Sequence, residues 1–235
     1  MTDFKYEIKD LEVMSEARNY HNWVLAELNP FLGQSVAEVG AGSGNFSSFL
    51  LQSPTLTKLT SVEPDQAACA MYKQNITDPR AEIVNGFFSD VYTKYPNNFD
   101  AIVFVNVLEH VEDDKGELEN VYKSLKGGGR VCIFVPALPF LFSDHDKEIG
   151  HFRRYTKSTL KKVLEERGFV VEKIKYMDIV GIVTWYLVFK VLKMNPGRGN
   201  ISFYDKFITP VLRVLEGLIP PPIGKSLLAI GKKRD

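Results

Sequence analysis

Apolar runs alternate along the chain with segments whose apolar side chains recur at helical spacing. Residues 99–105 form a continuous apolar run after a turn-like Asn-Asn pair, as expected for a central parallel strand buried on both faces. The runs that we expect to be strands are 36–39, 58–62, 81–84, 99–105, 130–135, 170–176 and 226–232. The segments with helical spacing are 16–28, 46–50, 66–74 and 118–125, the last ended by glycines 127–129. This alternation predicts an α/β fold.

The first predicted strand runs into a turn with glycine at alternate positions, Gly40, Gly42 and Gly44, and Ala41 lies between the first two. A strand, a glycine turn and a helix in this order present backbone N–H groups to a ligand. Glycine is needed there because the turn takes φ values that a Cβ would forbid, and because ligand atoms approach the backbone closely. The sequence therefore predicts a ligand site at this turn.

An acid at the end of the second predicted strand indicates the kind of ligand. Glu63, followed by Pro64, lies 23 positions after Gly40. A carboxylate about 20 residues after the first glycine is placed to accept hydrogen bonds from the hydroxyls of a ribose. The glycine turn and Glu63 together predict a cofactor that contains adenosine.

The details of the turn favour a cationic cofactor over a dinucleotide. In the dinucleotide pattern the third glycine comes one residue later, at the position that Asn45 occupies here. Glu38, two residues before Gly40, would repel a pyrophosphate but suits the amino group and sulfonium of S-adenosylmethionine. The pattern Glu38-x-Gly40-x-Gly42-x-Gly44 resembles the first motif of the class I S-adenosylmethionine-dependent methyltransferases. An ordinary glycine-rich turn is the simpler alternative.

A second segment extends this resemblance to small-molecule methyltransferases, including those of ubiquinone biosynthesis. Residues 106–111, Asn-Val-Leu-Glu-His-Val, resemble the segment that follows the fourth strand of these enzymes. The resemblance implies that Asn106 and Val107 lie at the methionine end of the cofactor and that Tyr20 is near its carboxylate. Phe87 and Phe88 would flank the adenine, at a place where many relatives have an acid.

The resemblance also implies a fold and a reaction. The fold is a Rossmann-like sheet of seven mostly parallel strands, with the last strand antiparallel and helices on both faces. The expected reaction moves a methyl group from S-adenosylmethionine to a small-molecule acceptor and leaves S-adenosylhomocysteine. Two alternatives are a nicotinamide-dependent oxidoreductase, which Glu38 and the early third glycine disfavour, and a non-catalytic protein that binds an adenosyl ligand.

Residues 143–155, between the fifth strand and the next helix, are dense in acids, histidines and arginines. The loop leaves the same sheet edge as the glycine turn, where loops carry function. If the acceptor is a hydroxyl, a histidine is the natural base, and we expect His145 first, His151 second and His110 third. Arg153 and Arg154 would clamp an acidic or phosphorylated acceptor, or form surface ion pairs with Asp144, Asp146 or Glu148. The acids and histidines match no metal-ligand template, so we expect no metal.

The chain is predicted to be one methyltransferase domain, 1–235. Its parts are a helical lid at 1–34, a cofactor-binding core at 35–176, a hydrophobic helical insertion at 177–225 and the last strand at 226–235. Helix 16–28 would cover the ligand or simply pack on the sheet. The insertion holds an uncharged run, 179–189, too short for the roughly 20 residues that cross a bilayer. We expect segment 179–219 to wall an apolar or lipid-linked acceptor; peripheral membrane contact, a homodimer contact and plain core packing stay open.

Composition adds limits to these predictions. The 235 residues carry 29 basic and 29 acidic side chains, so the formal net charge is zero and nothing favours nucleic acid as a partner. Two cysteines do not make a disulfide framework. The first ten residues are polar and charged, so we expect no signal peptide and a cytoplasmic location.

Overall fold

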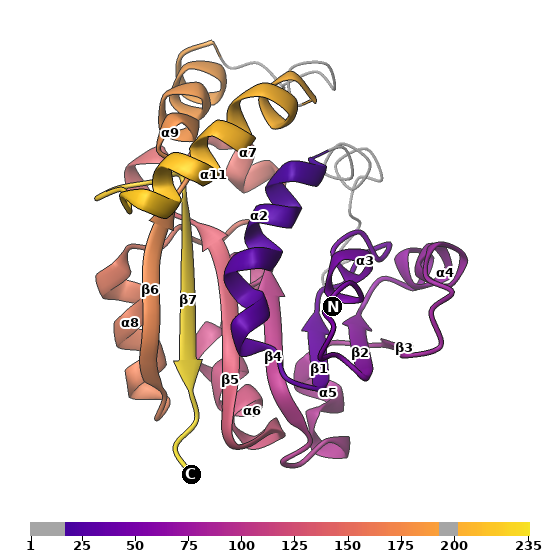
Figure 1. Cartoon of the computed structure of the whole chain (residues 1–235). Coiled ribbons are helices and arrows are strands. Elements are labelled where there is room, and N and C mark those ends of the chain that lie inside the picture. The colour runs from indigo at the N-terminus through magenta and orange to yellow at the C-terminus, as the bar shows by residue number, and fades with distance from the viewer. Residues whose placement is uncertain (1–16, 193–201) are drawn as a thin grey trace.

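A seven-stranded sheet forms the centre of the computed structural model, which describes residues 17–192 and 202–235 (Figure 1). The strand order is β3-β2-β1-β4-β5-β7-β6. The strands are β1 (Ser35–Val39), β2 (Lys58–Glu63), β3 (Ala81–Asn85), β4 (Phe99–Val105), β5 (Leu125–Pro136), β6 (Val170–Met177) and β7 (Ser226–Lys232). Each strand expected from the sequence is present, several of them longer than expected.

Six strands run parallel, and β7 lies antiparallel between β5 and β6. This arrangement confirms the predicted Rossmann-like fold with an antiparallel last strand. Because the first six strands run in one direction, their carboxyl ends meet at one edge of the sheet. Ligands of open α/β sheets bind outside that edge.

Helices cover both faces of the sheet, as expected (Figure 1). One face packs against α5, α6 and α8 through side chains such as Phe88, Leu118 and Leu160, and the other against α2, α3 and α11. The α-helices are α2 (Arg18–Leu28), α3 (Ser47–Leu50), α4 (Gln66–Asn75), α5 (Phe88–Val91), α6 (Asp114–Ser124), α7 (Asp144–Glu148), α8 (Lys157–Glu166), α9 (Ile179–Trp185) and α11 (Thr209–Leu218). Short 3₁₀ turns are η1 (Asn29–Phe31), η2 (Tyr92–Lys94), η3 (Leu108–His110) and η4 (Pro139–Leu141).

The boundary between α6 and β5 differs from the sequence prediction. Leu125 and the three glycines after it, expected to end the helix, belong to the strand, because Leu125 pairs with Phe99 of β4. A Cβ on Gly129 would lie 2.9 Å from the carbonyl oxygen of Lys126 and 3.1 Å from that of Phe99. The glycines therefore let β5 start close to β4 rather than simply terminating a helix.

Residues 179–191 and 204–218 form a helical cap above the carboxyl edge of the sheet (Figure 1). Helix α9 continues as a π-helical segment, η5 (Tyr186–Val191), and α11 is preceded by a second one, η6 (Tyr204–Ile208). In the part of the chain that the structure describes, no helix is long and apolar enough to cross a membrane. The cap lies over the edge where the candidate site residues gather.

Candidate active site

The glycine turn after β1 has the conformation that its sequence requires. The φ angles of Gly40, Gly42 and Gly44 are +70°, +55° and +90°, which side chains with a Cβ rarely adopt. A Cβ on Gly40 would lie 2.5 Å from a methyl group of Val107. The backbone N–H groups of Gly40 and Ala41 donate to the carbonyl oxygen of Val62, which fixes the start of the turn beside β2.

Glu63 ties this turn to the end of β2. The Gly42 N–H donates to Glu63 Oε2 at 2.8 Å, and the Asp65 N–H donates to Oε1 at 2.9 Å. Glu63 is fully buried, and burial raises the pKa of its carboxyl despite the two backbone donors. Each oxygen keeps a lone pair beyond the one used here, so the side chain can hold the turn and still accept a ribose hydroxyl.

Glu38 lies beneath the turn in a pocket of hydroxyl groups. Its carboxyl accepts hydrogen bonds from Ser47 Oγ and, at 3.1 Å, from Ser61 Oγ, and the side chain is buried. The pKa of this carboxyl is raised to about 7, mainly by burial and to a smaller extent by the negative charge of Glu63, against the lowering effect of the two serine hydrogen bonds. The structure thus gives Glu38 a supporting place under the turn; its predicted contact with the cofactor remains a prediction.

Asn106 begins the loop after β4 with an unusual backbone angle. Its φ is +54°, and its N–H donates to the carbonyl oxygen of Phe134 at 2.8 Å. Leu138 and Asp178, just after β5 and β6, also have positive φ, at +63° and +65°. Backbone strain of this kind clusters at functional sites. The next residue, Val107, packs on Gly40, so the loop after β4 touches the glycine turn directly.

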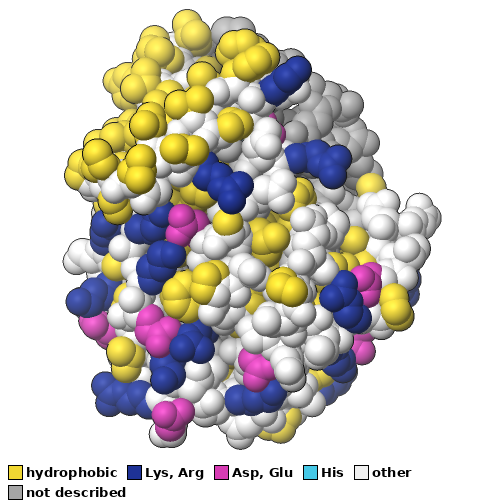
Figure 2. Space-filling model, in the orientation of Figure 1, with side chains coloured by type: hydrophobic (Ala, Val, Ile, Leu, Met, Phe, Trp, Pro, Cys, Tyr) yellow, Lys and Arg dark blue, Asp and Glu magenta, His cyan; other side chains and the backbone are white. Residues whose placement is uncertain are grey.

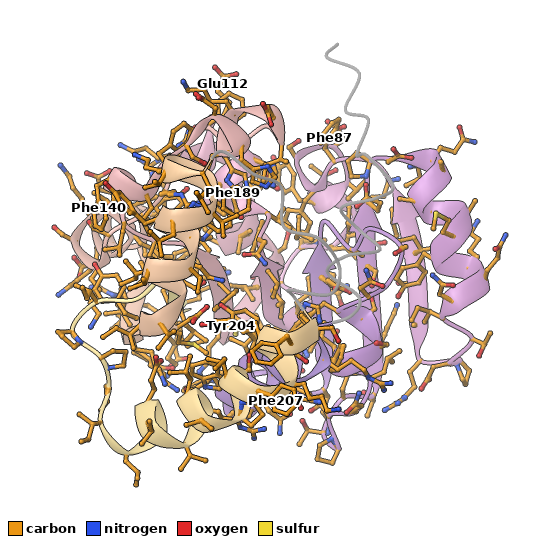
Figure 3. All side chains as sticks on the ribbon, turned by 90° about the horizontal axis from the view of Figure 1, so that it is seen from above. Phe87, Glu112, Phe140, Phe189, Tyr204 and Phe207 are labelled. Carbon is orange, nitrogen blue, oxygen red and sulfur yellow. The ribbon has the colours of Figure 1, made fainter. Side chains whose placement is uncertain are left out.

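The two phenylalanines predicted to flank adenine lie in different environments. Phe87 follows β3 and is 49% exposed, whereas Phe88 is 1% exposed and part of the core. Figure 3 shows Phe87 at the rim of the same edge, opposite the helical cap that carries Phe189. Pro64 lies nearby, and its carbonyl oxygen accepts from Asn85 Nδ2 at 3.0 Å. Of the two rings, only Phe87 has surface to stack on a base.

Tyr20 lies at the start of α2 and is largely buried. Its hydroxyl is 2.9 Å from Ser226 Oγ at the beginning of β7, and its ring packs edge-on against Phe134 and Trp23. Burial raises the pKa of this phenol above its ordinary range. Helix α2 therefore packs on the sheet at this point, and the predicted contact between Tyr20 and the cofactor's carboxylate stays a prediction.

A buried ion pair organises the loop between β5 and α8. Arg154 pairs with Asp146 at 2.8 Å, and both side chains are almost fully buried. Asp146 Oδ1 is also 2.8 Å from His151 Nδ1. Arginine 153 pairs instead with Asp114 at 2.9 Å. The predicted pairing of the arginines is therefore correct for Arg154 and Asp146, but the pair lies inside the protein rather than on its surface.

His110 and His151 lie together, whereas His145 lies apart from them. The rings of His110 and His151 meet edge-on, with their centroids 4.5 Å apart. Burial, and to a smaller extent the neighbouring His151, lower the pKa of His110 to about 4. The ring of His145 stacks on Phe189 at 4.5 Å and lies 5.8 Å from Trp185. Of the three candidate bases, His110 and His151 thus form a largely buried pair, whereas His145 lies against the aromatic rings of the cap.

Glu109 is the residue that the sequence predictions missed. It is fully buried between the two loops, and burial raises the pKa of its carboxyl to about 8. His110, the next residue, is one of the expected bases. Glu109 lies in the same segment, 106–111, but nothing in its sequence position marks it as a functional acid. Its proximity to His151 arises only through the fold.

The glycine turn, the buried acid Glu63 and the exposed ring of Phe87 lie at one edge of the sheet, the arrangement that the sequence predicts for an adenosyl ligand. The fold is that of Rossmann-like α/β proteins. Residues 14–174 match the family model described as a methyltransferase domain. The chain belongs to this family, and the resemblance to class I S-adenosylmethionine-dependent methyltransferases is confirmed.

Other comparisons agree with this assignment. The chain is 26% identical over 129 residues to the mitochondrial ubiquinone biosynthesis O-methyltransferase of Schizosaccharomyces pombe, a match that covers 52% of this chain and 46% of that protein. The matched segment thus spans about half the length of that curated relative.

Two solved structures have a similar fold. One is a SAM-dependent methyltransferase from Archaeoglobus fulgidus, with a TM-score of 0.61 and 17% identity over 92% of this chain and 94% of that one. The other is phosphoethanolamine N-methyltransferase 2 of Haemonchus contortus in complex with S-adenosyl-L-methionine. Its TM-score is 0.65 and its identity 15%, over 96% of this chain and 57% of that one.

Proposed function

We propose that this methyltransferase acts on a small acceptor that is apolar or linked to a lipid, and that the acceptor meets the cofactor at the carboxyl edge of the sheet. The observation that carries the proposal is the contact between Gly40 and Val107. It joins the glycine turn to the loop after β4, which in turn is bound to the loop 144–155 through Phe152 N–H and the Glu109 carbonyl oxygen at 2.9 Å. These contacts connect the turn that we propose binds the cofactor with the loop that we propose faces the acceptor.

On the cofactor side, this chain's own residues would bind and orient S-adenosylmethionine. Gly40, Ala41, Gly42 and Gly44 expose backbone to it, Glu63 accepts from the ribose, and Phe87 stacks on adenine. When bound, the cofactor supplies a methyl group on a sulfonium, activated for in-line transfer. Asn106 and Val107 are proposed to lie at its methionine end. Alignment of the acceptor with this methyl group can supply much of the rate.

On the acceptor side, we propose His145 as the general base. It lies on α7 beneath Trp185 and Phe189, whose rings are 4.1 Å apart and form the inner side of the cap. An imidazole in a partly apolar setting can take a proton from a hydroxyl acceptor at neutral pH. The aromatic rings would contact the apolar part of that acceptor. His110 and His151 are the other candidate bases.

The outer side of the cap supports contact with a lipid surface. Its exposed apolar side chains lie on α9, η5 and α11 and form the hydrophobic region at the top of the face in Figure 2. They include Val183, Leu187, Val211, Val214, Leu215 and Leu218.

The charges of the cap complement an anionic membrane. Both acids of the described cap, Asp205 and Glu216, are buried and accept backbone N–H groups of Tyr20 and Ile179, respectively. Lys206 and Arg213 are exposed. An apolar face flanked by cations is typical of peripheral membrane helices. We propose that this face docks on a bilayer that holds the acceptor.

The lipid contact is tested by co-sedimentation with vesicles of anionic phospholipid. We expect the protein to bind these vesicles and Leu215→Asp/Leu218→Asp to lose binding, whereas Val170→Asp, an exposed apolar position on β6, retains it. Equal recovery of all three proteins in the supernatant would contradict the membrane proposal. Concentration-dependent dimers that the cap variant abolishes, without vesicle binding, would assign the face to a homodimer instead.

The acceptor class is tested by measuring S-adenosylhomocysteine formation with a panel of hydroxyl compounds. We expect turnover to rise with the length of an attached alkyl chain and with vesicles that present the compound. Faster turnover of the short-chain, fully water-soluble compounds of the panel would contradict an apolar acceptor.

A further inference from the structure

Three potential metal-ligand side chains converge where the loop after β4 meets the loop after α7. Glu109 and His110 belong to η3, and His151 lies 41 positions further along the chain. One ligand atom from each lies within 4.8 Å of the other two. The set combines His151 of the loop 143–155 with two residues that follow β4, and only the fold brings His151 beside Glu109.

The Glu109 carboxylate lacks the partners that a buried acid needs. The side chain is 0% exposed, and neither oxygen accepts a hydrogen bond from any part of the chain that the structure describes. The nearest ion-pair atom is His151 Nε2, 3.8 Å from Oε1. A buried carboxylate without hydrogen bonds is costly, so a proton or a cation must accompany it.

His151 is oriented so that one nitrogen remains directed at this carboxylate. Its Nδ1 is 2.8 Å from Asp146 Oδ1, and Asp146 is in turn held by Arg154 Nε at 2.9 Å. A carboxylate that accepts from Nδ1 fixes the tautomer in which Nε2 carries a free lone pair. Metal-binding histidines are commonly held by such a second carboxylate. Because Arg154 balances Asp146, the remaining cluster consists of the Glu109 carboxyl group and two imidazoles.

We propose that Glu109, His110 and His151 bind a divalent transition-metal ion such as Zn²⁺. Two imidazoles and one carboxylate form the ligand set of many catalytic zinc sites and of non-haem iron sites. Imidazole nitrogens disfavour Mg²⁺ and Ca²⁺, which prefer oxygen. Small side-chain movements would bring the three ligand atoms into one coordination sphere, and the ion would neutralise the buried carboxylate.

Such an ion would influence which acceptor the enzyme uses, an inference that rests on the proposed function. The site shares the loop after β4 with Asn106 and Val107, next to the glycine turn. A bound transition metal acts as a Lewis acid that lowers the pKa of a hydroxyl it contacts. This would favour an acceptor with a hydroxyl able to reach the ion, and it would assign His110 and His151 to ligation rather than to proton transfer.

The test uses Co²⁺, whose visible absorption reports the ligands and geometry of a zinc-type site. The full chain without an affinity tag is titrated with Co²⁺ and then with Zn²⁺. The variants are Glu109→Gln and His151→Gln, and the matched control is His145→Gln, a histidine on the same loop outside the cluster. Thermal unfolding of each metal-free protein establishes that it is folded.

We expect one Co²⁺ per chain, displaced by Zn²⁺, and a rise in the unfolding temperature of the wild type with either ion. Each ligand variant should lose at least about 100-fold in Co²⁺ affinity, since even second-shell changes cost 10–100-fold. His145→Gln should bind as the wild type does. Absence of specific Co²⁺ absorption from the wild type, or equal binding by Glu109→Gln, would overturn the proposal. The titration needs neither cofactor nor acceptor, so its failure is separable from failure of the proposed function.

Discussion

The backbone N–H of Gly42 donates to Glu63 Oε2 at 2.8 Å, which ties the centre of the glycine turn to the end of the neighbouring strand β2. One side chain thus shapes the turn and stands where a ribose is expected. The two motifs that predicted an adenosine cofactor are therefore one structural unit. A change at either residue should therefore alter cofactor affinity both through the shape of the turn and through the expected ribose contact.

Glu63→Ala is expected to weaken binding of S-adenosylhomocysteine by about one to two orders of magnitude. The variant removes the acceptor of the Gly42 N–H and the carboxylate that we propose accepts from the ribose. Calorimetric titration of the variant and the wild type measures the difference. Glu82→Ala, an acid of the adjacent strand β3, is the control and should bind normally. Unchanged affinity in Glu63→Ala would remove this residue from the site.

Gly40→Ala is expected to lower cofactor affinity by roughly tenfold or more and to destabilise the fold. The new Cβ would lie 2.5 Å from a Val107 methyl group, and φ is +70°. Gly217→Ala on α11 is the control, because a Cβ there meets nothing within 4 Å. That variant should be stabilised by about 0.5–1 kcal/mol, as a helical alanine is. Thermal unfolding and titration of both variants compare them, and similar behaviour would contradict the tight contact.

Glu38 is expected to make stability fall as the pH rises. The pKa of its carboxyl is raised from an ordinary value of 4.5 to about 7 in the folded protein, so the folded state holds the proton more tightly than the unfolded chain does. The contribution of Glu38 to the free energy of unfolding is fully present below its unfolded-state pKa and is lost as the pH rises through its folded-state pKa. The loss amounts to about 3 kcal/mol.

Glu38→Gln tests this dependence by thermal unfolding of the ligand-free protein at about pH 5 and about pH 8. The variant cannot ionise, so its stability relative to the wild type should increase at the higher pH. Glu82→Gln provides a control for the loss of an acid outside the hydroxyl pocket. A difference between Glu38→Gln and the wild type that stays constant across this range would refute the proposed ionisation.

His145→Ala is expected to spare cofactor binding and to reduce turnover by about 100-fold, the usual contribution of a general base. Titration with S-adenosylhomocysteine and initial rates with an accepted hydroxyl compound separate the two effects. Lys147→Ala on the same short helix is the control, because Lys147 is exposed and pairs with Asp144 at the surface. Full activity of His145→Ala would restrict His145 to packing against Phe189.

The sheet could be predicted because local patterns carry its information. Apolar runs mark the buried parallel strands, and the Gly40 turn requires positive φ wherever it occurs. The start of β5 could not be predicted, because Leu125 follows a helical face in sequence and joins the strand only through its pairing with Phe99. Helical periodicity contains no information about a partner 26 residues away.

The buried parts of the candidate site were harder to predict for the same reason. An ion pair between Arg154 and Asp146 follows from their nearness in sequence, but its burial depends on how the loop folds under the cap. The meeting of Glu109 with His151 depends on two loops that leave different strands. Sequence identifies such residues as polar and reactive without revealing which of them share a site.

Whether the glycine turn and Glu63 bind S-adenosylmethionine is measured by calorimetric titration with S-adenosylhomocysteine, with NADH as the control. We expect S-adenosylhomocysteine to bind the wild type, to bind Glu63→Ala about one to two orders of magnitude more weakly, and NADH not to bind. Binding of NADH alone would contradict the assignment of the cofactor and favour an oxidoreductase.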